Sequence, residues 1–345
     1  MTGYTATFFS LTVLLGSCFH RTEPTDDRDV AISALEAHFL ENQAWETGDY
    51  LMKMTFEEKG QTLKVREGTD PPNFSFEGET TTYFRLIFDF PNKRLFFIRA
   101  IDTENHVFDE DGKEIIGDGL PTIDHRLSGF VMANGECVSR SLPKNVIKSS
   151  HPKLVKNLGD TLVRFSVPEL RGIGLQVFGE ARRYDSVASL ADQLCTPDRI
   201  NKATVSSESI YLQADLGGND PNLESRFADI RLNAKDRTIE FSEFFIKRKG
   251  VPLPDSLVRQ EIEWNKEFEI PVPSHVSGYS IAGRRVGKYT YSVRRTLDAH
   301  VHWFSMNETI EEERFDKDVL RNPDEMKKQV DPEALDVEFS NKPKE

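Results

Sequence analysis

The residues with the spacing of metal ligands are His300 and His302, in the run His300-Val301-His302. Residues i and i+2 of a β-strand lie on the same face, so the two imidazoles could share a zinc ion if a third ligand completed the site. The sequence nominates no third ligand. The preferred interpretation is a solvated strand face with Val301 and Trp303 pointing inward, and we expect no metal. A metal-dependent hydrolase built on this pair is the third functional alternative.

Other motifs that could perform chemistry are incomplete. Gly278, Gly283 and Gly287 surround a pair of arginines, but a phosphate-binding loop needs a helix N-terminus directly after it, and none is expected here. Bulges or hairpin turns explain these glycines better. The chain has no Gly-x-Ser-x-Gly elbow, and Cys137 and Cys195 do not form a Cys-x-x-Cys pair. We therefore expect a non-enzymatic protein without a cofactor.

The first twenty residues have the anatomy of a bacterial lipoprotein signal. An uncharged apolar run, Phe8 to Leu15, ends in Leu15-Gly16-Ser17-Cys18 and then turns polar. The run is shorter than the ~20 apolar residues that a membrane span needs, but it suits a signal peptide. We expect residues 1–17 to be removed and Cys18 to carry the lipid anchor, followed by a tether over 18–26. A plain secretory signal cut elsewhere is the alternative, because residues 1–7 contain no Lys or Arg.

Composition limits the partners. The 345 residues carry a formal net charge of −13, which disfavours nucleic acid, and 24 phenylalanines can build a large apolar core. If Cys18 is acylated, Cys137 and Cys195 are left as an even pair outside the cytosol, where a disulfide could persist. Two separate buried thiols are the alternative. The expected partners are a membrane through Cys18 and a lipid or lipidated protein, with no protein partner identified.

The first element expected after the tether is an amphipathic helix over residues 27–47. Val30, Leu35, Phe39 and Leu40 recur at helical spacing, and Gly48-Asp49 marks the end of the helix.

Beyond the helix the apolar period changes from helical to two. Residues 82–90 alternate with Phe84, Leu86 and Phe88 on one face, which predicts a half-buried strand. A turn at Pro91-Asn92 and a return strand over 93–101 complete an antiparallel hairpin. Further strands are expected near residues 210–215, 227–233, 238–247, 258–264, 275–282 and 284–305. Short helices are expected at 151–159 and 186–194, and the charged, proline-interrupted residues 321–345 predict a loosely ordered tail.

These elements resemble the LolA/LolB-like outer-membrane lipoprotein-sorting superfamily. The resemblance is carried by the helix around Leu35 and Phe39, the strand at residues 51–56, the hairpin at residues 84–98 and the turn at residues 109–113. It implies a mainly β (α+β) fold, in which an N-terminal helix and short helices cover a curved antiparallel sheet or incomplete β-barrel. One such domain would occupy residues 27–320, with two similar halves, 27–185 and 186–320, as an alternative.

In that superfamily the apolar concave face holds acyl chains or a lipidated partner. The resemblance therefore implies an extracytoplasmic, membrane-anchored lipoprotein on the periplasmic face of the cell envelope, which binds an apolar or lipidated ligand. The candidate lining residues are Phe84, Leu86, Phe88, Phe97 and Phe241. An open barrel leaves an interior that a ligand can fill. The same side chains could instead form a solid core, which would favour a structural or protein-interaction module of the envelope.

Overall fold

The computed structural model describes residues 26–61, 64–65, 73–117, 122–143, 151–155, 170–174, 194–217, 222–250, 255–286 and 289–339. The strands of these residues form one 14-stranded antiparallel sheet, which confirms the expected mainly β fold. Their bounds are β1 Thr47–Gln61, β2 Lys64–Val65, β3 Ser75–Asp89, β4 Arg94–Phe108, β5 Thr122–Ala133, β6 Glu136–Pro143, β7 Lys153–Leu154, β8 Ile200–Val205, β9 Ser209–Asp215, β10 Leu223–Asn233, β11 Ile239–Arg248, β12 Asp255–Asn265, β13 Val272–Val286 and β14 Tyr289–Met306.

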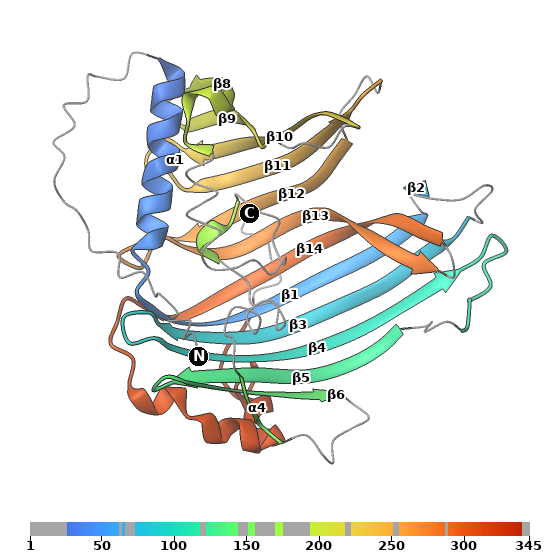
Figure 1. Cartoon of the computed structure of the whole chain (residues 1–345), viewed down its shortest axis with the longest axis vertical. Helices are drawn as coiled ribbons and strands as arrows, with labels where there is room; N and C mark the ends of the chain where they lie inside the picture. The colour runs from blue at the N-terminus through green and yellow to red at the C-terminus, as the bar shows by residue number, and fades with distance from the viewer. Residues whose placement is uncertain are drawn as a thin grey trace, which may run out of the picture.

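Two meanders build this sheet, and the first and last long strands join them. The order is β7-β6-β5-β4-β3-β1-β14-β13-β12-β11-β10-β9-β8. The short strand β2 lies outside this order and pairs with β14. The sheet curves strongly, as Figure 1 shows, and in the described residues its end strands β7 and β8 do not pair with each other. The result is an open, curved sheet with an inner and an outer face.

The β3–β4 hairpin has the turn that the sequence predicts. Residues 90–93 form the turn, and Lys93 takes a left-handed φ of 56°. The buried Asp89 carboxylate accepts hydrogen bonds from the Asn92 amide and from Arg94 Nε, both at 3.0 Å. Burial would raise the pKa of Asp89, but the hydrogen bonds from Asn92 and Arg94 outweigh it and hold the pKa below its ordinary value.

The N-terminal helix α1 (Asp27–Gln43) is shorter than expected, because Thr47 and Gly48 already belong to β1. Asp26 caps it by accepting a hydrogen bond from the Arg28 amide at 3.2 Å. The helix packs on β8 and β9, and in Figure 1 it runs across strands β8 to β12 near one end of these strands. Leu35 and Phe39 are buried as expected, whereas Leu40 is 67% exposed.

The C-terminal segment corrects the expectation of a loosely ordered tail. Residues 310–339 contain η3 (Glu312–Phe315), η4 (Lys317–Arg321) and the short helix α4 (Pro323–Lys328), and they lie against β4, β5 and β6 (Figure 1). They bury apolar side chains on the outer face of the sheet, against Leu51, Ile87, Phe96, Ile98 and Val131. The buried members of the segment are Ile310, Phe315, Leu320, Met326, Val330 and Val337. Residues 340–345 lie outside the described residues.

A buried ion pair also fixes this segment to the sheet. Arg85 of β3 donates to both carboxylate oxygens of Asp49 of β1 at 2.9 Å, and both side chains are 6% exposed. From the C-terminal segment, Gln329 Oε1 accepts from Arg85 at 3.1 Å and Arg314 donates to Asp49. The hydrogen bonds of this ion pair therefore connect the sheet to the segment that covers it.

The two expected short helices are not confirmed. Residues 153–154, inside the expected helix 151–159, form strand β7 beside β6. The rest of that stretch from residue 156, and residues 186–193 of the second expected helix, lie outside the described residues. Two further short elements are described, η1 (Leu170–Gly172) and η2 (Pro197–Arg199).

Candidate functional site: the inner face of the sheet

The inner face of the central strands carries one continuous aromatic cluster. Four of the five predicted lining residues, Phe84, Leu86, Phe88 and Phe97, lie in it, and each is no more than 3% exposed. Ring centroids are 6.1 Å apart between Phe84 and Phe97, and 5.6 Å between Phe97 and Phe130. Because side chains alternate along a strand, the period-two pattern places these rings on the same face.

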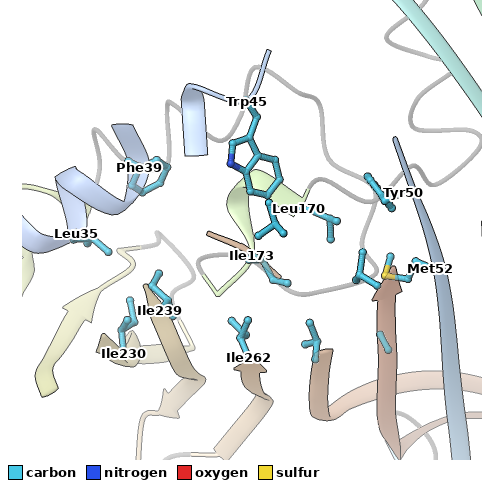
Figure 2. Close-up of a cluster of buried hydrophobic side chains, with 14 of the residues drawn as sticks. Leu35, Phe39, Trp45, Tyr50, Met52, Leu170, Ile173, Ile230, Ile239 and Ile262 are labelled. Carbon is cyan, nitrogen blue, oxygen red and sulfur yellow. The ribbon is translucent and has the colours of Figure 1, made fainter. Parts of the chain in front are cut away.

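Between α1 and the sheet, this cluster is filled by the protein's own side chains. Figure 2 shows Leu170 and Ile173, at and just after η1, between α1 and the strands, with Ile239 and Ile262 facing them. The cluster therefore includes residues far apart in the chain, and its phenylalanines are buried without any ligand.

The fifth predicted lining residue, Phe241, does not belong to this cluster. It pairs across β11 and β12 with Glu261, on the face opposite to the buried Gln260 and Ile262. Its ring lies between the guanidinium groups of Arg231 and Arg259, 5.6 and 5.1 Å from the ring centroid. The bulge between Arg231 and Leu232, opposite Ile239 and Phe241, changes the side-chain alternation at this point, which sequence periodicity does not show.

Next to the aromatic cluster, the inner face becomes polar. Arg99 of β4 pairs with Phe84 on one side and with Ser128 of β5 on the other. Arg99 Nε and Ser128 Oγ are both buried and have no hydrogen-bond partner. Burial, together with the charge of Arg126 nearby, lowers the pKa of Arg99 to about 10. Two unsatisfied donors, one of them cationic, are a local arrangement that suits an anionic group.

A second apolar cluster lies farther along the same strands. Phe76 of β3, Val107 of β4, and Tyr291 and Val293 of β14 are all at most 5% exposed, and they share the inner face with Phe84 and Phe97 by even spacing. The ring of Phe74 is 5.3 Å from that of Tyr291. Arg99 and Ser128 thus occupy a polar strip between two apolar regions of the inner face.

His300 and His302 lie on the outer face of β14. His300 and His302 alternate with the buried Val301 and Trp303, which is the arrangement that the sequence predicts. The two imidazoles do not act as a pair, because the His302 ring packs edge-on against Phe304 at 4.8 Å. His300 instead lies next to His275 of β13 and Asp298 of its own strand. Sequence reasoning missed both, although Asp298 stands two residues before His300 and the spacing alone would have nominated it.

Cys137 and Cys195 are not bonded to each other. Cys137 is buried and Cys195 half-buried, and no disulfide joins them, so the disulfide alternative is not realised in the structure. Burial raises the pKa of the Cys137 thiol to about 11. Cys18 and the whole expected signal peptide and tether lie outside the described residues, apart from Asp26. Among the described helices, none has the length and apolar character that a membrane crossing requires.

Comparison with known proteins finds matches among solved structures. No protein-family model and no curated protein matches this chain. A LolA superfamily protein from Nitrosomonas europaea shares 10% identity over 84% of this chain and 98% of its own, with a TM-score of 0.36. A structure titled as an outer membrane lipoprotein-sorting protein domain, from Vibrio parahaemolyticus, shares 9% identity over 86% of this chain and 100% of its own, also with a TM-score of 0.36.

A third similar structure is a β-barrel-like protein of a domain of unknown function from Brucella abortus. It shares 7% identity over 76% of this chain and 100% of its own, with a TM-score of 0.22.

Proposed function

We propose that the protein is an extracytoplasmic lipoprotein of the cell envelope, anchored through Cys18, that binds an apolar or lipidated ligand with an acidic group on the inner face of its sheet. The observation that carries the proposal is the pair of unsatisfied donors at Arg99 and Ser128, placed between two apolar clusters. An amphiphile offers both chemistries, because its acidic group can accept from Arg99 and its chain can cover apolar surface.

The role of Arg99 in this proposal is specific. The buried Nε of Arg99, which has no hydrogen-bond partner, carries a desolvation cost that nothing among the described residues repays. Replacing Arg99 with Met keeps much of the side-chain volume and removes that cost. We therefore expect the free energy of unfolding to stay the same or rise, while affinity for an acidic amphiphile falls.

The test is titration of the purified protein with a fluorescent fatty acid. Arg99→Met is expected to weaken binding by about tenfold or more, since a charge-assisted hydrogen bond contributes about 1.5–3 kcal/mol. The corresponding uncharged fatty alcohol should bind both proteins equally. Arg259→Met is the matched control, because Arg259 lies on the outer face and pairs with Glu261 at 2.6 Å. Failure of the wild-type protein to bind the fatty acid contradicts the proposal.

The anchoring part of the proposal has its own test. Native mass spectrometry of protein purified from its own membranes should report a mature chain that begins at Cys18 and carries acyl mass, together with any retained lipid. A chain cut elsewhere, without acyl mass, would contradict the anchor and leave the binding proposal to the titration.

A second function is favoured by one specific observation. Phe84, Phe97 and Phe130 are at most 1% exposed without a ligand, so this part of the inner face is a solid core. If the whole inner face is filled in this way, the protein is a structural or protein-interaction module of the envelope. The fatty-acid titration separates the two functions, because a solid module takes up neither the acid nor the alcohol.

A further inference from the structure

On the outer face, at the seam between β13 and β14, two imidazoles and a carboxylate converge. His275 and His300 stand directly opposite each other in the strand register, and their rings stack with centroids 4.4 Å apart and planes 20° from parallel. His275 Nε2 is 2.7 Å from Asp298 Oδ1, and His300 Nε2 is 3.0 Å from Asp298 Oδ2. The three ligand atoms offered by these residues all lie within 4.8 Å of one another.

We propose that His275, Asp298 and His300 form a binding site for a divalent transition metal, with Zn²⁺ as the best-suited ion. Two imidazole nitrogens and one carboxylate oxygen form a ligand set that proteins use for zinc, with a fourth position left for water. Ligand atoms around a tetrahedral zinc are about 3.3 Å apart, since each lies about 2 Å from the metal. The two nitrogen–oxygen distances, 2.7 and 3.0 Å, are close to this value, and all three ligand atoms lie within 4.8 Å, so side-chain rotations could bring them to one ion.

The surroundings of His275 support the same assignment. Its second ring nitrogen, Nδ1, is 3.3 Å from Glu263 Oε1 of the neighbouring strand β12. A carboxylate in this position holds the proton on Nδ1 and leaves the Nε2 lone pair for a metal, as outer-shell carboxylates of zinc sites do. The two imidazoles are only partly exposed, at 21% and 19%, and the ring of Phe339 from the C-terminal segment lies 6.4 Å from that of His300. The site is thus backed on one side by an apolar ring.

Other described histidines lack this combination and supply controls. His302 lies on the same strand face as His300, but it packs on Phe304 and is not part of the convergent group. His125 contacts a single carboxylate, that of Asp102. Substituting either histidine should leave the metal affinity unchanged.

The test is a Zn²⁺ titration of the full, tag-free protein against a chromogenic chelator, after prior removal of metal. We expect one equivalent of tight binding. His275→Ala and His300→Ala should each weaken it by more than about a hundredfold, and Glu263→Gln by about 10–100-fold, the range for outer-shell partners. His302→Ala and His125→Ala should bind like the wild type. Co²⁺ bound at the same stoichiometry should show visible absorption typical of four-coordinate nitrogen and oxygen ligands.

Thermal unfolding keeps the result interpretable if a variant is less stable. Zn²⁺ should raise the Tm of the wild type and of His302→Ala, because a ligand that binds only the native state stabilises it. The same ion should leave the Tm of Asp298→Asn and His300→Ala unshifted. Absence of stoichiometric Zn²⁺ binding, or binding that survives in His275→Ala and His300→Ala, overturns the proposal.

Discussion

At the scale of single residues, His38 shows how burial changes the chemistry of a side chain. It lies in α1, 1% exposed, with Nε2 3.1 Å from Asn42 Nδ2 and its ring edge-on to Trp264. Burial lowers its pKa to about 3, although the charge of Asp236 acts in the opposite direction. The imidazole is therefore neutral in the native protein throughout the physiological range.

This burial predicts a pH dependence of stability. In the unfolded chain His38 has an ordinary pKa of about 6.5, so it binds a proton at pH values where the native imidazole stays neutral. The free energy of unfolding therefore falls as the pH drops below about 6.5. Between pH 7 and pH 5.5 the loss should be about 1 kcal/mol in urea unfolding. His38→Gln should remove that part of the slope, and an unchanged slope in His38→Gln would contradict the assignment.

Sequence reasoning at this scale found side chains but not their partners. The inward Val301 and Trp303 and the outward His300 and His302 follow from alternation alone. His275, 25 positions before His300, could not be paired with it, because the register between β13 and β14 is set by the whole pair of strands.

At the scale of the elements, Gly278 in β13 is a position where two strands approach too closely for any side chain. Its φ is +150°, and an added Cβ would lie 1.9 Å from the backbone oxygen of Arg259 in β12. The close approach of the β12 backbone therefore explains why a glycine stands inside β13. This agrees with the expectation that Gly278 is not part of a phosphate-binding loop.

Gly278→Ala should therefore weaken the β12–β13 pairing. We expect a loss of about 3 kcal/mol or more in the free energy of unfolding, because both the backbone conformation and the strand spacing must change. Gly112→Ala is the control, since Gly112 also has a positive φ, +76°, but nothing lies within 4 Å of its added Cβ. That control should lose only about 1 kcal/mol. Equal losses in urea unfolding would show that close approach at Gly278 is unimportant.

Elements with regular periodicity were predictable, and those without it were not. The β3–β4 hairpin was found because its apolar residues alternate and a turn with proline separates them. In the C-terminal segment, Ile310, Phe315 and Leu320 recur every five residues, which fits neither a helix nor a strand. From residue 321, charged residues and prolines suggested a loosely ordered tail, although Met326, Val330 and Val337 bury against the sheet.

At the scale of the whole molecule, the central strands of the sheet are covered on both faces, and their outer face is covered by the C-terminal segment. Leu51, Ile87, Phe96 and Ile98 point outward beneath that segment and are at most 1% exposed. The alternating pattern predicted one solvated face for these strands, and the segment explains why both faces of the central strands are apolar.

Removing the segment should expose this surface. A chain that ends at Glu308 is expected to bind a hydrophobic dye and to self-associate in size-exclusion chromatography, because a contiguous apolar patch of this kind promotes association. A chain that ends at Phe339 is the control and should behave like the full protein. A monomeric, dye-negative chain ending at Glu308 would contradict the covering role of the segment.

The order of the strands could not be predicted from periodicity, since alternation describes a strand without naming its neighbours. The expected curved sheet is confirmed, but the pairing of β1 with β14 at its centre was not foreseen.

That central pairing has a consequence for how the chain acquires its structure. Glu46 and Asn307, at the ends of β1 and β14, are hydrogen-bonded although they lie 261 positions apart. Such a high contact order makes folding slow, because a very long loop must close before the contact contributes. During synthesis from the N-terminus, one edge of β1 stays unpaired until residue 306 has been added. That edge is therefore open to pairing with other chains for most of the synthesis of the protein.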